Sequence, residues 1–149
     1  ETINRTKKGA KAPNFSYKNQ KGEIFSLKDF KGKYVFIDVW ATWCGPCIQQ
    51  IPSLKILEHK YADKDIVFVS ISVDKMSAIE KWKKMLIDKD LKGIQLIADK
   101  SFNSDFIEAF GISSIPRFII IDKDGIILNN NASKPSEEKT DQYLKMLLN

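Results

Sequence analysis

Between an apolar run and an amphipathic run, the chain reads Trp43-Cys44-Gly45-Pro46-Cys47, which holds the only two cysteines of its 149 residues. A single Cys-x-x-Cys pair after a strand pattern and before a helix pattern is typical of a dithiol redox site. Free amide N–H groups at a helix start stabilise negative charge on the first sulfur. We therefore expect Cys44 to attack with a lowered pKa, and Cys47, one turn into the helix and less exposed, to resolve.

Other uses of the cysteine pair fit the sequence less well. A zinc site normally takes four ligands, and the single histidine, His59, is the only further nitrogen candidate. Attachment of a c-type haem requires histidine directly after the second cysteine, where this chain has Ile48. A purely structural disulfide across so short a loop restrains little chain entropy. We expect redox catalysis with no metal and no cofactor beyond the Cys44–Cys47 disulfide.

Strand-like and helix-like segments alternate along the chain, which is typical of an α/β fold with a central sheet. The predicted strands are 15–17, 24–27, 34–39, 66–73, 94–98, 117–121 and 126–128, the first two forming a hairpin. The predicted helices are 45–61, 77–90, 102–110 and 135–148. Ser77 and Glu80 predict a capping box, Gly111 ends the third helix, and Pro135 suits the first position of the last helix.

The bulk composition limits the classes of partner. The formal net charge is +5, and the lysines are scattered rather than gathered among aromatic residues, so we expect no nucleic acid as a partner. No run of about 18 apolar residues predicts a membrane span. Residues 1–11 are polar and are interpreted as a trimmed leader or linker that once followed an export signal, an anchor or another domain. A single domain is predicted over residues 12–149.

Residues 36–47 resemble the active-site strand and helix start of the thioredoxin superfamily, and Ile115-Pro116 resembles its second signature, a cis-proline that faces the dithiol. The similarity extends from about residue 12 to residue 148. The N-terminal hairpin, Ser72-Val73-Asp74 and residues 118–125 resemble the TlpA/ResA branch more than small thioredoxins. The resemblance implies a thioredoxin-like fold, with a central mixed sheet flanked by helices and an added N-terminal β-hairpin.

The resemblance also implies an activity and a location. Members of the branch are thiol-disulfide oxidoreductases that usually reduce protein disulfides, and they are exported, periplasmic, or anchored in the membrane facing the periplasm. The implied partners are protein disulfides or dithiols, together with an upstream thiol donor that is membrane-bound in some members. We expect the chain itself to be a monomer.

Several residues take a role from the resemblance. Asp38 resembles a buried carboxylate that shuttles a proton to and from the resolving cysteine, and burial should raise its pKa toward neutrality. Asp74 follows the next strand and is the alternative relay. Substrate contacts are expected from the residues around the dithiol and from the cis-proline loop, namely Trp43, Gly45, Pro46, Ile115 and Pro116. Arg117 stands where a small residue is common, and could hold Cys44 as a thiolate, select acidic partners, or lie in solvent.

Two other functions are compatible with parts of the sequence. The first is a peroxiredoxin-like peroxidase, although such sites usually place threonine three residues before the cysteine and Thr42 stands two before Cys44. The second is a non-catalytic Cu(I) chaperone that uses both thiols, although no histidine lies nearby to complete the ligand set.

Overall fold

Strand β3 (Tyr34–Trp40) runs through the interior of the sheet, because all of its residues except Tyr34 are buried and all except Asp38 are apolar. The computed structural model describes residues 5–149. Strand β3 pairs in parallel with β4 (Ile66–Ser72) and antiparallel with β6 (Arg117–Ile121). The other strands are β1 (Ser16–Asn19), β2 (Ile24–Ser26), β5 (Ile94–Ile97) and β7 (Ile127–Asn129). The seven strands form one mixed sheet in the order β2-β1-β5-β4-β3-β6-β7, which confirms the predicted class and its N-terminal hairpin.

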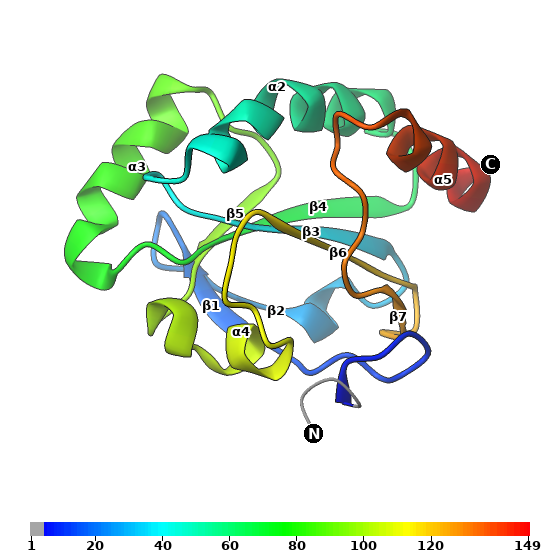
Figure 1. Ribbon diagram of the computed structural model, residues 1–149, viewed down its shortest axis with the longest axis horizontal. Helices are drawn as coiled ribbons and strands as arrows, with labels where there is room; N and C mark the ends of the chain where they lie inside the picture. Colours follow the sequence, from blue (N-terminus) through cyan, green and yellow to red (C-terminus); the bar gives the residue numbers. More distant parts are fainter. Residues whose placement is uncertain (1–4) are drawn as a thin grey trace.

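Helices cover both faces of the sheet (Figure 1). The helices α2 (Gly45–Lys60) and α5 (Glu138–Leu148) lie over one face, where Leu54, Leu57 and Leu144 pack with Phe36. The helices α3 (Ile79–Asp88) and α4 (Asp105–Ala109) contribute to the larger hydrophobic cluster on the other face. Short 3₁₀ turns lie at Leu27–Phe30, Met76–Ala78 and Ser101–Asn103. Within residues 5–149 no helix combines the length and the hydropathy that crossing a membrane requires.

The segment before the first strand is attached to the turn between β6 and β7. The Gly9 N–H donates to the Ile127 carbonyl at 2.8 Å, and the Ala12 N–H donates to the Gly125 carbonyl at 2.8 Å. Of the polar segment predicted at 1–11, residues 1–4 lie outside the described part of the chain. Residues 9–11 lie against the domain, and the predicted boundary at residue 12 stays a prediction.

Two predicted helix starts are wrong. The capping box of Ser77 and Glu80 does not form, because Met76–Ala78 is a 3₁₀ turn and Ala78 is the N-cap without a side-chain hydrogen bond. The last helix begins at Glu138 rather than at Pro135. A turn precedes it, since the Glu137 N–H donates to the Lys134 carbonyl at 3.0 Å and the Glu137 carboxylate accepts from the Lys134 N–H at 2.9 Å.

The helix predicted at 102–110 is interrupted. Ser104 has an extended backbone (φ −68°, ψ 146°), and its hydroxyl accepts from the Lys100 N–H at 2.8 Å, so a 3₁₀ turn and the short α4 replace one continuous helix. Gly111 follows α4 with a φ of 63°, a left-handed conformation that glycine adopts without strain. The predicted end of this helix is therefore confirmed.

Phe106 on α4 joins several parts of the larger cluster. Its side chain is 0% exposed, and its ring lies edge-on to Phe15 at 5.3 Å and tilted against Phe110 at 4.7 Å between ring centroids. The Phe106 N–H also donates to the Tyr17 hydroxyl at 3.2 Å. The N-terminal hairpin and α4 therefore share one buried aromatic contact.

Replacing Phe106 with alanine should lower the free energy of unfolding by about 3–5 kcal/mol, because the buried ring leaves a cavity. Denaturant titration of the purified protein measures this loss. The control is Ile87→Ala, which removes a side chain that is 79% exposed on α3 and should change stability by less than about 0.5 kcal/mol. Equal losses in the two variants would contradict this account of the core.

Candidate active site

The two cysteines lie at the N-terminus of α2 and form a disulfide. Cys44 is the N-cap residue, and its sulfur accepts a hydrogen bond from the Cys47 N–H at 3.2 Å. Pro46 lies in the first turn of the helix, where its missing N–H costs no hydrogen bond. The positive end of the helix dipole and an amide N–H therefore point at Cys44 Sγ, as predicted, and this arrangement stabilises a thiolate there.

The exposure of the two sulfur-bearing residues differs from the prediction. Cys44 is 5% exposed and Cys47 is 4% exposed, so the expected contrast between an outer and an inner cysteine is absent in the disulfide form. The residues around them are open, since Gly45 and Pro46 are exposed and the Trp43 side chain is 59% exposed. A reacting group must therefore approach Cys44 over the surface that these three neighbours make.

The loop before β6 faces the disulfide. The Ile115–Pro116 peptide bond is cis, and the Ile115 carbonyl oxygen lies 3.8 Å from Cys44 Sγ. In the disulfide this sulfur carries no proton, so the contact becomes a hydrogen bond only in the reduced thiol. Both loop residues are partly exposed. The structure thus brings Ile115 and Pro116 beside Cys44, where the resemblance placed the substrate backbone.

Asp38 is a buried residue of β3. Its partner in the parallel register is Ser70 of β4, whose hydroxyl donates to the Asp38 carboxylate at 2.6 Å. Asp38 and Cys47 line the same small cavity beneath α2. Burial raises the pKa of the Asp38 carboxyl from 3.8 to about 7, and the Ser70 hydrogen bond opposes this shift only in part. A carboxyl with this pKa can gain or lose a proton near neutral pH.

Asp74, the other predicted relay, has different surroundings. It is 1% exposed, and its carboxylate accepts from the Thr42 N–H at 3.1 Å and from the Thr42 hydroxyl at 2.7 Å. The Ser72 hydroxyl donates to the same carboxylate at 2.5 Å. These bonds tie the end of β4 to the loop that leads into Cys44. The geometry therefore makes Asp74 an anchor for that loop, and puts Asp38 rather than Asp74 at the cavity beside Cys47.

The sequence interpretation missed six polar or charged residues of this cavity, which are Gln50, Lys55, Glu58, Ser70, Lys92 and Gln95. Glu58 had a detectable signal. It lies on the same face of α2 as Cys47, Ile51 and Leu54, because successive spacings of four, three and four residues follow one side of a helix. A carboxylate within such a stripe of inward-facing residues indicates a buried polar site. Ser70 could be found only by knowing the register of β3 with β4.

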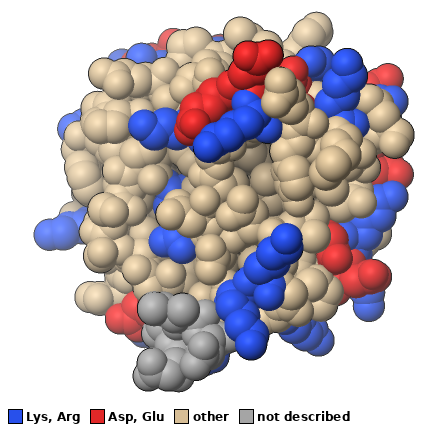
Figure 2. All heavy atoms as spheres, turned by 45° about the vertical axis from the view of Figure 1, so that its right-hand side comes forward, with Lys and Arg blue, Asp and Glu red and all other residues tan. Residues whose placement is uncertain are grey.

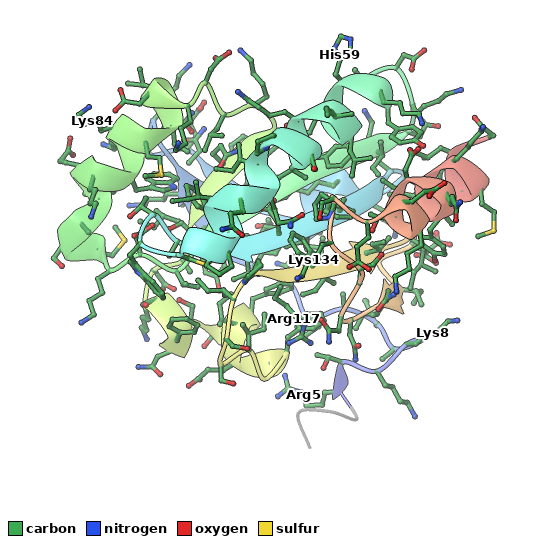
Figure 3. The ribbon with its side chains drawn as sticks, turned by 45° about the horizontal axis from the view of Figure 1, so that its top comes forward. Arg5, Lys8, His59, Lys84, Arg117 and Lys134 are labelled. Carbon is green, nitrogen blue, oxygen red and sulfur yellow. A yellow bond between two sulfur atoms is a disulfide. The ribbon has the colours of Figure 1, made fainter. Side chains whose placement is uncertain are left out.

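The structure also places His59 and Arg117, the two other residues considered from the sequence. His59 is exposed near the end of α2 and points away from the sheet (Figure 3). Arg117 is half-buried, and its Nε donates to the Asn130 carbonyl at 2.7 Å. Arg117 therefore ties the start of β6 to the segment after β7, and a contact with Cys44 stays a prediction.

Charged side chains of both signs lie on the face of the molecule that Figure 2 presents. Figure 2 shows lysine and arginine side chains interspersed with carboxylates over the face that it presents. On this face the distribution agrees with the scattered lysines of the sequence, and the absence of a nucleic-acid partner stays a prediction.

Comparison with known proteins finds a matching family model and similar chains. The family model described as Redoxin matches residues 7–147. The thiol-disulfide oxidoreductase ResA of Bacillus thuringiensis is 33% identical over 140 residues, covering 93% of this chain and 78% of that protein. The thioredoxin-like protein YneN of Bacillus subtilis is 34% identical over 139 residues, covering 93% and 79%.

Solved structures of similar chains also include thiol-disulfide oxidoreductases. A solution structure from Bacteroides vulgatus, of a protein proposed to be a thiol-disulfide oxidoreductase, is 48% identical with a TM-score of 0.80, covering 90% of this chain and 86% of that one. A thiol-disulfide oxidoreductase from Bacteroides fragilis is 28% identical with a TM-score of 0.82, covering 93% and 99%.

The raised pKa of Asp38 predicts a pH dependence of stability. The folded chain keeps this proton up to about pH 7, whereas an ordinary aspartate loses it near 3.8. Between these values the folded state binds more protons than the unfolded state, so the free energy of unfolding falls as the pH rises. Asp38→Asn should therefore be more stable than wild type above pH 7, by a few kcal/mol at about 1.4 kcal/mol per pKa unit.

This stability difference should vanish below about pH 4, where both states of the wild type hold the proton. Denaturant titrations of the disulfide form across this pH range measure the effect. Asp124→Asn makes the same chemical change on an exposed turn and should follow the wild type. An Asp38→Asn variant that is never more stable than wild type would contradict the assignment.

Proposed function

Because the chain belongs to the Redoxin family, we propose a function for its two cysteines. The proposed function is the reduction of protein disulfides through Cys44 and Cys47. Its relatives and structural neighbours place it in the thioredoxin superfamily with the TlpA/ResA-like proteins, as predicted. It is a thiol-disulfide oxidoreductase with a thioredoxin-like fold. The observation that carries the proposal is the disulfide at the start of α2, opposite the Ile115–Pro116 loop.

The first step of the proposed reaction occurs at Cys44. In the dithiol form its thiolate attacks one sulfur of a substrate disulfide, forming a mixed disulfide and releasing the other substrate sulfur as a thiolate. The Cys47 N–H, at 3.2 Å from Cys44 Sγ, supports the charged sulfur before the attack. Trp43 and Pro46 would provide the exposed contact surface, and the backbone of Ile115 would pair with the substrate.

The second step releases the reduced substrate. Cys47 gives its proton to the Asp38 carboxylate, and its thiolate then attacks Cys44 Sγ. The bond between Cys44 and the substrate breaks, the Cys44–Cys47 disulfide forms, and the electron pair leaves on the substrate thiolate, which takes a proton from water. A shared cavity and a pKa of about 7 support Asp38 in this role. The cycle then needs an upstream thiol donor and no redox group besides the chain's own disulfide.

The direction, partners and location follow from the resemblance. The Gly45-Pro46 pair between the cysteines resembles the reducing members of the superfamily. We propose that the substrates are protein disulfides in an oxidising compartment, that the chain acts as a monomer facing the periplasm or an equivalent space, and that a thiol donor, membrane-bound or not, returns it to the dithiol form. The relatives named ResA support the general kind of partner.

A peroxidase function receives less support from the site. The Thr42 hydroxyl donates to the Asp74 carboxylate at 2.7 Å, and the Thr42 N–H donates to the same group. This threonine therefore anchors the loop, and its hydroxyl is not free to polarise a peroxide beside Cys44.

Cys47→Ser should trap substrates on Cys44. The variant keeps the attacking sulfur but lacks the resolving one, so mixed disulfides with oxidised protein substrates should accumulate. Incubation of the reduced variant with insulin, followed by non-reducing gels and mass spectrometry of the adduct, measures the trapping. Cys44→Ser is the matched control and should form no adduct, and trapping by this control instead would reverse the two roles.

The midpoint potential should lie at roughly −200 to −270 mV, the range of reducing dithiol proteins. Equilibration of the purified protein with thiol buffers of known potential, followed by alkylation and mass spectrometry, measures it. A value near about −120 mV, typical of a strong oxidant, would contradict the reductive direction while leaving the exchange chemistry in place.

A further inference from the structure

A small cavity lies under α2 and is lined by Cys47 and by a second carboxylate, that of Glu58. Its volume is about 20 Å³, which is room for one water molecule. Residues of α2 and of the strands β3, β4, β5 and β6 line it, together with Pro116 of the cis-proline loop. The titratable and charged residues that line it are Asp38, Cys47, Lys55, Glu58 and Lys92. The mechanism above uses only the first two.

Glu58 comes unusually close to the backbone on the far side of the cavity. A Cβ atom on Gly93 would lie 2.7 Å from Glu58 Oε2 and 2.8 Å from the Phe68 carbonyl oxygen. Gly93 also has a φ of 73°, which disfavours any other residue. The glycine thus leaves space for the Glu58 carboxylate between α2 and the approach to β5. Glu58 is itself partly exposed, so it reaches solvent as well as the cavity.

The two lysines at the cavity are bound to other groups. Lys55 Nζ donates to the Lys89 carbonyl at 2.6 Å, and Lys92 Nζ pairs with the Asp90 carboxylate at 2.9 Å. Among residues 5–149 no ion pair or hydrogen bond to the Glu58 side chain is formed, although the charge of Lys55 still acts on it. Glu58 therefore has no cation in contact that would hold it permanently ionised.

Electrostatics link Glu58 to Asp38. Burial, as the larger cause, and the negative charge of Asp38 together raise the pKa of the Glu58 carboxyl from 4.5 to about 7, while the charge of Lys55 opposes the shift. The Asp38 carboxyl has a pKa of about 7 as well. Two carboxyls with similar affinity for a proton, in one poorly solvated space, titrate as a coupled pair.

We propose that Glu58 is a positioning residue for catalysis, which carries the resolving-step proton between Asp38 and solvent. The proposal rests on the proposed function. Cys47 gives its proton to the Asp38 carboxylate, Asp38 passes a proton to the Glu58 carboxylate, and Glu58 releases it to water. The transfer to Glu58 leaves Asp38 ionised again, the release to water leaves Glu58 ionised, and the electron pair on Cys47 forms the new bond to Cys44.

Two buried polar atoms support a hydrated path between the carboxylates. Gln95 Oε1 and Trp40 Nε1 have no hydrogen-bond partner among the described residues, and both side chains line the cavity. They are an acceptor and a donor, respectively. A water molecule in this space would satisfy such atoms and could relay a proton from Asp38 to Glu58.

The coupling can be measured without turnover. Carboxyl ¹³C NMR of the disulfide form, titrated through neutral pH, follows Asp38 and Glu58 directly. In Asp38→Asn the pKa of Glu58 should fall, by about one unit or a tenfold change in its ionisation constant, because the neighbouring negative charge is gone. Glu80→Gln removes a carboxylate that is 84% exposed on α3, and should leave both titrations unchanged. A Glu58 titration that is the same in Asp38→Asn and wild type would overturn the proposal.

The pH profile of the resolving step separates a proton path from a structural role. Reduced protein is mixed with an aromatic disulfide reagent, and the second burst of coloured thiolate reports the attack of Cys47 on Cys44. Glu58→Gln should slow this phase by roughly tenfold at neutral pH, less than the hundredfold or more expected on losing the general base itself. The first phase, at Cys44, should not change.

Three outcomes are distinguishable. A second phase in Glu58→Gln with the rate and pH profile of wild type would overturn the proposal, even if the carboxyls prove to be coupled. Equal slowing of both phases would also overturn it, since that result indicates a general structural defect. A wild type that shows no second phase and reduces no insulin would reject the proposed function, whereas the NMR titrations would still decide whether Asp38 and Glu58 are coupled.

Discussion

The hydrogen bond from the Cys47 N–H to Cys44 Sγ depends on where α2 begins, and the chemistry of the site depends on that bond. The first amides of a helix have no partner within the helix, so the helix start offers them to whatever residue caps it. Here the cap is a sulfur atom at 3.2 Å. If the helix began one residue earlier or later, the cysteine would lose this donor. The loop between β3 and α2 must therefore end at a defined position.

Two buried aspartates near this helix start have different hydrogen-bond surroundings. Asp74 accepts hydrogen bonds from Thr42 and Ser72, and so attaches the loop before Cys44 to the end of β4. Asp38 receives one hydroxyl bond, from Ser70, and burial raises its pKa to about 7. The hydrogen bonds to Asp74 hold the loop before Cys44 in place, whereas the raised pKa of Asp38 supports its proposed role as a proton relay. The different numbers of donors, rather than the residue type, separate the two roles.

Local sequence signals predicted most elements and failed where longer-range contacts compete. The apolar run of β3 and the redox pair are local patterns, and the structure has them where expected. Ser77 and Pro135 also carry local signals for a helix start, but the helices begin at Ile79 and Glu138. A turn held by Lys134 and Glu137 takes the place of the first turn expected after Pro135. Such turns are held by side-chain hydrogen bonds, which helix propensity alone does not predict.

The amino-acid sequence alone was sufficient to predict the reacting cysteines, because a cysteine pair at a helix start is a local pattern within residues 34–47. The local pattern indicated that Asp38 and Glu58 face the interior, but it did not contain the contacts that these two side chains make. The neighbour of Asp38 is set by the register of β3 with β4, and the room for Glu58 is set by the approach of Gly93 to α2. Those contacts join residues far apart in the chain, and burial in the folded core is what brings the pKa values of the two carboxyls close together.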